Sequence, residues 1–399
     1  MKKMFTPLVS QRKGWASSIF LTLLFLVFSL FMGLGRGGLS SLRDGILYGI
    51  ALAFSAAILF LILRTGRIHR WRRIFFSTYA VAFAIQFVWW TMGDRGHMWL
   101  LDKEVLYAGA PMCHMVVPML LLPLVFTKTI IFPTSLSQAA FMILLVIVVG
   151  IVYGRSFCSW GCFFGGQDEL FAGLPRKKRW TIGRLPPFIR YFSYGLLAFI
   201  IMHSLATLSP TYCLWFCPFK TSSEFIEVNS FIRVIQTFIF VILWAGLAVV
   251  LPLLTKKRTQ CGLFCPMGAF LSCTARINLF RIAVDREKCG DCGLCESVCP
   301  TFSLNEESLA KGKTLNNCTR CGACIETCPK AAIHFVFPGI KSGPPAPAEG
   351  KTSGGRRFLR ELADPATIFV MGIFLVANVI AFESLIGAMS RLLRYFFKV

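Results

Sequence analysis

Long apolar runs separated by short polar segments dominate the chain. Hydrophobic residues make up 55% of its 399 positions, and several uninterrupted stretches reach the length of about 20 residues that a helix needs to cross a bilayer. The pattern therefore predicts an all-α polytopic membrane domain with seven spans. The predicted spans are Trp15 to Leu34, Ile46 to Leu63, Ile74 to Met92, Ala139 to Tyr153, Phe188 to Ala206, Phe231 to Leu254 and Ala366 to Ile386.

An eighth apolar stretch, Met115 to Phe132, contains Pro118, Pro123 and Lys128. Two prolines and a lysine would leave costly polar groups in a lipid-exposed helix. We therefore expect a re-entrant segment here, although a complete span is the alternative.

The net charge of +23 would suggest nucleic acid in a soluble protein, but the basic residues lie in loops beside the apolar runs. They act as topology signals, so no nucleic-acid partner is expected. Three basic clusters, at 64–73, 176–179 and 256–258, are expected to face the cytoplasm of a cell's inner membrane.

Two runs of cysteines near the C-terminus predict an iron–sulfur domain. Each run has the spacing Cys-x-x-Cys-x-x-Cys-x-x-x-Cys-Pro, which is that of a ferredoxin with two [4Fe–4S] clusters. In such ferredoxins the fourth cysteine of each run binds the cluster of the other run. One predicted ligand set is Cys289, Cys292, Cys295 and Cys328, and the other is Cys318, Cys321, Cys324 and Cys299. Zinc is the alternative metal, but two identical four-cysteine runs fit the iron–sulfur pattern better.

Cys-x-x-x-Cys pairs also occur at the ends of apolar runs. Cys158 and Cys162 lie in a segment that resembles the one around Cys261 and Cys265, which makes an internal repeat. Two cysteines are too few for a cluster or a tetrahedral metal, so the four thiolates together could form one site at the cytoplasmic face. Buried packing of these cysteines is the alternative.

These motifs resemble the membrane polyferredoxins of the NapH and NosR type, which pair Cys-x-x-x-Cys-Pro motifs in the membrane with a two-cluster ferredoxin. The resemblance covers about residues 137 to 335. Phe163 stands where the first motif should have a proline, and we expect no flavin-bearing extracytoplasmic domain of the kind that the NosR-type proteins carry. The resemblance implies electron transfer at the membrane, often between quinone and an extracytoplasmic reductase.

A third pair, Cys213 and Cys217, is expected on the outer side together with Cys113. With His114 or His203 these cysteines could form a further iron–sulfur or metal site. A disulfide between Cys213 and Cys217 is the alternative.

The predicted organisation has five parts. They are an N-terminal membrane region with the re-entrant segment (1–135), a polyferredoxin-type membrane core (136–275), a small α+β two-cluster ferredoxin-like insert on the cytoplasmic side (280–338), a linker (339–365) and a C-terminal membrane helix (366–399).

The predicted function is the relay of single electrons between a cytoplasmic or quinone donor and a membrane or extracytoplasmic redox protein. The chain is expected to be an electron-carrying subunit in contact with lipid rather than a stand-alone enzyme. A quinol dehydrogenase is one alternative, with Glu383 or His203 as its proton acceptor. A transporter or assembly factor for iron or copper is another, since cysteine and methionine are soft ligands.

Overall fold

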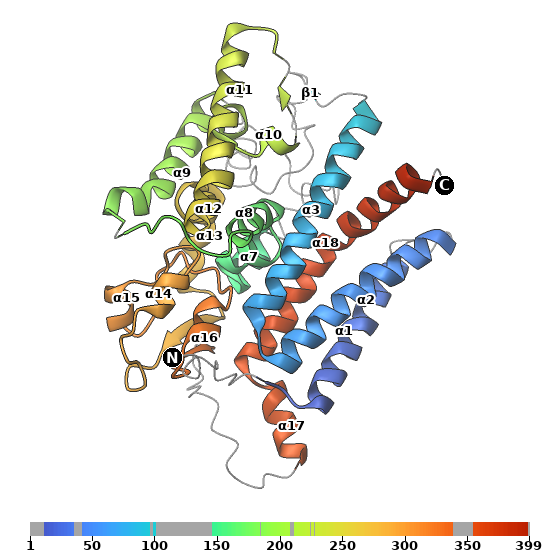
Figure 1. The fold of residues 1–399 in the computed structure, drawn as a ribbon, viewed down its shortest axis with the longest axis vertical. Coiled ribbons are helices and arrows are strands. Elements are labelled where there is room, and N and C mark those ends of the chain that lie inside the picture. Colours follow the sequence, from blue (N-terminus) through green and yellow to red (C-terminus); the bar gives the residue numbers. More distant parts are fainter. Residues whose placement is uncertain are drawn as a thin grey trace. The chain divides into compact units, whose positions relative to one another are not determined.

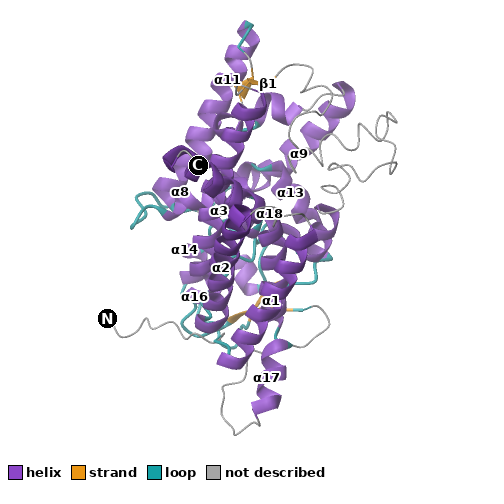
Figure 2. Ribbon diagram, turned by 90° about the vertical axis from the view of Figure 1, so that its right-hand side faces the viewer, coloured by secondary structure: helices purple, strands orange, loops and turns teal. Residues whose placement is uncertain are grey.

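A computed structural model describes residues 12–35, 42–95, 99–100, 146–183, 185–207, 211–223, 225–226, 228–337 and 354–397. Most of these residues are helical (Figure 2). Within this part of the chain, five helices are long and apolar enough to cross a membrane: Trp15–Met32, Leu42–Thr65, Pro187–Thr207, Phe231–Thr255 and Pro365–Phe396.

These five helices correspond to five of the seven predicted spans. The predicted span Ile74 to Met92 lies within α3 (Ile68–Arg95), which is not one of the five candidates. The segment Ala139 to Tyr153 is only partly described, and Met115 to Phe132 lies outside the described residues together with Cys113 and His114.

The chain forms two compact units. The first contains residues 1–86, 156–166 and 279–399, and the second contains residues 87–155 and 167–278. Because the first unit combines three separate parts of the sequence, the N-terminal helices fold together with the cysteine-rich region. The five-part division predicted from the sequence stays a prediction.

Candidate membrane helices of the first unit pack against one another (Figure 1). α1 (Trp15–Gly35) and α18 (Pro365–Phe397) both contact α2 (Leu42–Thr65) and each other. The ammonium of Lys13 lies 2.5 Å from the carboxylate of Asp364, and its backbone amide donates to the carbonyl of Leu63. The starts of α1 and α18, the end of α2 and the start of α3 therefore lie at one end of this unit, which we call the basic end.

The ferredoxin-like part of the first unit is a small α+β fold. Strands β3 (Arg281–Val284) and β4 (Ile333–Val336) pair antiparallel, with Arg281 opposite Val336. Between them lie the short helices α14 (Leu294–Val298), α15 (Glu306–Ala310) and α16 (Ala323–Thr327). Asn305 and Ser308 form a capping box at the start of α15. The predicted fold class, a helical membrane domain with a small α+β insert, is therefore confirmed.

The second unit contains two long apolar helical segments. α9 (Pro187–Thr207) packs against α13 (Pro266–Cys273), while α11 (Phe231–Leu243) continues through a π-helical stretch, Trp244–Val250, into α12 (Leu251–Thr255). Lys256 ends α12 in the left-handed conformation, with φ of 58°. The chain then enters a second π-helical turn, Gln260–Phe264, which carries Cys261.

Gly166 marks a close approach between α8 (Phe163–Gly173) and α3. A Cβ atom at this position would lie 2.6 Å from the Cβ of Ala80 and 3.0 Å from the carbonyl oxygen of Phe76. Small residues allow such approaches of helix backbones in membrane proteins. Both neighbouring atoms belong to rigid parts of α3, so they cannot rotate away.

We expect Gly166→Ala to lower the free energy of unfolding by about 1–3 kcal/mol, because the added methyl group overpacks this contact. Gly195→Ala in α9 is the matched control, since its Cβ would have no atom within 4 Å. Thermal unfolding in detergent measures both variants. Equal melting temperatures for the two would contradict the close approach at Gly166.

Candidate metal centres

The two ferredoxin loops have the same backbone conformation at equivalent positions. Asp291 and Arg320, each just before the second cysteine of its run, have φ of 44° and 49°. Gly293 and Gly322 follow with φ of 68° and 82°, and both initiate a short helix. The fourth cysteines also agree, with φ and ψ of −63° and 114° at Cys299 and −70° and 113° at Cys328. The sequence repeat is therefore a structural repeat.

A small cavity lies at the second loop. Its lining includes Cys299, Cys318, Cys321 and Cys324, which are the four thiols of one predicted ligand set. The cavity also borders Thr319, whose hydroxyl is buried and has no hydrogen-bond partner among the described residues. Four thiols and an unpaired donor around one cavity fit a [4Fe–4S] cluster, which needs thiolate ligands and accepts hydrogen bonds at sulfur.

The other predicted set is also brought together. Cys295 lies close enough to Cys289, Cys292 and Cys328 to interact electrostatically with all three thiols. Cys328, from the second run, thus lies beside the first three cysteines of the first run. Backbone amides approach the two fourth cysteines in the same way, from Ser303 to Cys299 at 3.2 Å and from Ala332 to Cys328 at 3.3 Å.

Burial favours the protonated form of several of these thiols. It raises the pKa of Cys295 to about 11 and that of Cys324 well above its ordinary value. These cysteines would ionise only with a strong cation beside them, as iron provides. No three His, Cys, Asp or Glu side chains within the described ranges converge closely enough for a single metal ion, as tetrahedral zinc requires. In a [4Fe–4S] cluster each iron takes one thiolate, so the four thiols of a set need not converge on a single ion.

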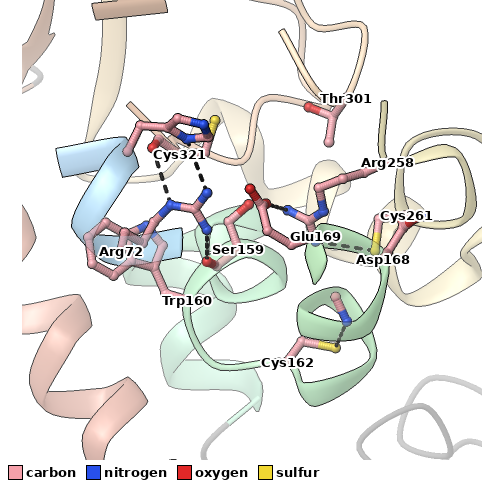
Figure 3. A network of polar contacts seen from close by, with 12 residues as sticks. Arg72, Ser159, Trp160, Cys162, Asp168, Glu169, Arg258, Cys261, Thr301 and Cys321 are labelled. Atoms are coloured by element: carbon pink, nitrogen blue, oxygen red, sulfur yellow. Dashed lines mark hydrogen bonds and ion pairs between the residues drawn. The ribbon is translucent and has the colours of Figure 1, made fainter. Parts of the chain in front are cut away.

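Arg72 joins the second ferredoxin loop to the segment that carries Cys158 (Figure 3). Its guanidinium is fully buried, and it donates to the carbonyl of Cys321 at 3.2 Å and to that of Ser159 at 2.5 Å. A third contact, of 3.3 Å, reaches the Nδ1 atom of His69. Since Ser159 follows Cys158 directly, one side chain connects a predicted cluster ligand with a membrane cysteine motif.

Further contacts fix the same loop within the first unit. The Arg320 guanidinium donates to the Ser156 hydroxyl at 3.0 Å, and the Trp160 indole donates to the Arg320 carbonyl at 3.5 Å. The Glu326 carboxylate accepts from the backbone amides of His69 and Arg70, at the start of α3. Carboxylates are favoured at helix N-termini, where amides lack intrahelical partners. The ferredoxin part is thus held against the basic end of the first unit.

The second cysteines of two Cys-x-x-x-Cys pairs have the same local geometry. The Cys162 thiol accepts from the amide of Gly165 at 3.4 Å at the start of α8, and the Cys265 thiol accepts from the amide of Gly268 at 3.4 Å at the start of α13. Amides at a helix N-terminus stabilise a thiolate.

Cys158 and Cys162 belong to the first unit, while Cys261 and Cys265 belong to the second.

Cys261 lies among buried charges of the second unit (Figure 3). Its thiol accepts from Arg258 at 3.3 Å, its amide donates to Asp168 at 2.9 Å, and its carbonyl accepts from Arg155. Arg258 also forms an ion pair with Glu169 at 3.5 Å. An arginine beside a buried thiol favours the thiolate, the form that binds metals.

Asp168 has an unusual protonation equilibrium. Burial raises its pKa to about 7, against the opposing effects of Arg258 and the hydrogen bonds from Cys261. Arg72, Arg155, Arg258 and Asp168 were not identified as site residues from the sequence. The sequence signal for such site residues is a charged residue next to a cysteine motif. Arg72 and Arg258 also belong to the basic clusters, so the sequence pattern assigns them to topology instead.

The third pair shows no complete site in the described residues. No disulfide joins Cys213 to Cys217 in the structure, and burial raises the pKa of Cys217 to about 12. His203 bonds to the hydroxyl of Thr211 at 2.8 Å. Cys113 and His114 lie outside the described residues, so the predicted outer site stays a prediction.

Comparison with known families assigns iron–sulfur domains to both regions. Residues 281–329 match the 4Fe-4S dicluster domain. Residues 137–181, 189–234 and 237–286 each match a 4Fe-4S binding domain, and each of these segments contains one Cys-x-x-x-Cys pair. The pair at Cys213 and Cys217 is therefore a third copy of the repeat found at the other two pairs.

Several known proteins are similar to part of this chain. The chain is 31% identical to YccM of Escherichia coli, a candidate electron transport protein, over 41% of this chain and 47% of the relative. It is 30% identical to the ferredoxin-type protein NapH of Haemophilus influenzae over 42% of this chain and 53% of NapH. It is 28% identical to the regulatory protein NosR of Pseudomonas aeruginosa, over 42% of this chain and 23% of NosR. The match spans about half the length of the first two relatives, and no solved structure matches.

The chain thus combines 4Fe-4S domains with five candidate membrane helices among its described residues, a combination typical of membrane proteins of ferredoxin type. Within this class the chain is similar to the NapH and NosR type of membrane polyferredoxin, so the resemblance inferred from its motifs is confirmed.

We expect Arg72→Met to lower the free energy of unfolding by about 3 kcal/mol, because two buried carbonyls lose a charged donor. The neighbouring Arg70→Met is the control, since the Arg70 side chain is exposed and lies over the Trp71 ring. Thermal unfolding in detergent compares the two. A larger loss in Arg70→Met than in Arg72→Met would contradict the bridging role.

Proposed function

We propose that this protein relays single electrons from its ferredoxin part to cysteine-ligated sites of its membrane domain, and from there to a redox partner. The observation that carries the proposal is the buried Arg72 bridge between the Cys321 and Ser159 carbonyls. It connects the second ligand loop with the Cys158 motif through hydrogen bonds alone.

The chain's residues have separate tasks in this proposal. When bound, [4Fe–4S] clusters supply one-electron chemistry. Cys289, Cys292, Cys295 and Cys328 would hold one cluster, and Cys299, Cys318, Cys321 and Cys324 the other. Arg72, Arg320 and Trp160 fix the second set against the Cys158 segment and exclude water from that contact, since all three side chains are buried.

The Cys158 and Cys261 motifs are proposed as the next redox site. Each pair alone offers only two thiolates, so it needs thiolates from elsewhere to bind a cluster. The match of all three pairs to a 4Fe-4S binding domain supports an iron–sulfur role. The sequence repeat alone supports one further step, in which four cysteines act as one ligand set: Cys158, Cys162, Cys261 and Cys265.

The distribution of charge supports a cytoplasmic position for the ferredoxin part. The basic end of the first unit carries Arg12, Lys13, Arg64, Arg67, Arg70, Arg73, Arg356, Arg357 and Arg360. At the opposite ends of α2 and α18, the basic side chains that the structure describes are Arg43, Arg391 and Arg394. Basic residues concentrate on the cytoplasmic side of membrane proteins, and Glu326 binds the ferredoxin part to the basic end.

We expect Cys158→Ser and Cys261→Ser each to abolish reoxidation of the reduced ferredoxin clusters in native membranes, because serine does not replace a thiolate ligand to iron. Both variants should keep the electron paramagnetic resonance (EPR) signals of the ferredoxin clusters. The control is Cys273→Ser, whose exposed thiol lies outside the motifs. Reoxidation at the unaltered rate in both variants would exclude the membrane pairs from the path.

Alkaline phosphatase, which is active only outside the cytoplasm, tests the orientation. Fusions after Gly66 and Gly350 should be inactive, and a fusion after Gly38, between α1 and α2, should be active. Activity at Gly350 with inactivity at Gly38 would show the reverse orientation.

A further inference from the structure

The two ferredoxin loops share a backbone but differ in charge at one equivalent position. Asp291 and Arg320 occupy this position with φ of 44° and 49°, so their side chains leave matching points of the two loops. One loop thus carries an anion and the other a cation. Extra positive charge near a cluster favours its reduced form, and negative charge disfavours it.

The surroundings of the two charges increase this difference. The Asp291 side chain is 67% exposed and pairs with the exposed Arg286 at 3.0 Å, so water and the arginine screen it. Arg320 is only 5% exposed and interacts electrostatically with Cys318. A second buried cation, Arg72, donates to the carbonyl of Cys321 in the same set. Charges in the interior act more strongly than screened charges at the surface.

The preceding position adds a hydrogen-bond donor to one loop only. Gly290 of the first run corresponds to Thr319 of the second. The Thr319 hydroxyl borders the cavity of its ligand set, is 1% exposed and has no partner among the residues that the structure describes. A donor directed at thiolate or sulfide stabilises the reduced cluster, whose sulfur atoms carry more negative charge.

Two effects oppose a higher reduction potential at the second ligand set. Cys292 is exposed, whereas Cys299, Cys321 and Cys324 are buried, and burial alone penalises the added negative charge of a reduced cluster. Lys330 also places a positive charge near Gly290, but its side chain is exposed and therefore screened. Two buried cations and a buried hydroxyl outweigh burial, because they act at short range in a medium of low dielectric constant.

We propose that Arg320 and Thr319 set the order of reduction, so that the cluster held by Cys318, Cys321, Cys324 and Cys299 has the higher potential. The inference rests on the proposed function, and it gives the relay a direction. A one-electron carrier that binds at the exposed Cys292 side is oxidised as it reduces the first set. The electron then moves downhill to the set joined by Arg72 to the Cys158 segment. The first set returns to its oxidised state as the second is reduced.

The test is a redox titration followed by EPR on the full chain, purified anaerobically in detergent and reduced with dithionite. The wild type should give two separate reduction waves. Arg320→Gln and Thr319→Val should each shift the higher wave to lower potential and leave the other in place. Asp291→Asn, the change at the equivalent position, should leave the higher wave unchanged.

Iron content is measured first in every sample. Wild-type protein without iron would overturn the proposed function itself, whereas two clusters with unshifted waves would overturn only this inference. A shift of the lower wave in Arg320→Gln or Thr319→Val would also overturn it. If Arg320→Gln lost its iron, Thr319→Val would decide, because it changes one hydroxyl to a methyl group of similar size.

Discussion

The buried guanidinium of Arg72 is the constraint on which the arrangement of the first unit depends. A fully buried cation is stable only when polar groups surround it, and Arg72 obtains them from Cys321, Ser159 and His69. These partners come from the ferredoxin part, from the Cys158 segment and from α3. One side chain therefore fixes three parts of the sequence, separated by up to 249 positions, around one point.

The same constraint connects structure with function. The ferredoxin loop is held by Arg72, Arg320 and Trp160 from the side of the Cys158 motif, and by Glu326 at the start of α3. A mobile ferredoxin domain on a linker would have to dock for each transfer. Here the contact is built into the fold, so the second ligand set keeps a fixed position relative to Cys158.

The sequence was sufficient for features that depend on local spacing. The ferredoxin-like domain and five of the long apolar helices could be predicted because their patterns repeat at short range. Arg72 and Arg258 could not be assigned correctly, because a basic residue beside an apolar run is typical of a solvated loop, and only tertiary contacts show that both are fully buried. The packing of the N-terminal helices together with the ferredoxin part could not be predicted either, because a local sequence pattern carries no information on contacts between residues so far apart.

The central claim is that the chain holds two [4Fe–4S] clusters on crossed ligand sets, one of them docked on the Cys158 segment. Mössbauer spectra of anaerobically purified single variants test it directly, because they distinguish a damaged cluster from an intact one. Cys299→Ser should change the same spectral component as Cys321→Ser, and Cys328→Ser the same component as Cys292→Ser. If Cys299→Ser instead changed the component altered by Cys292→Ser, the crossed sets would be wrong.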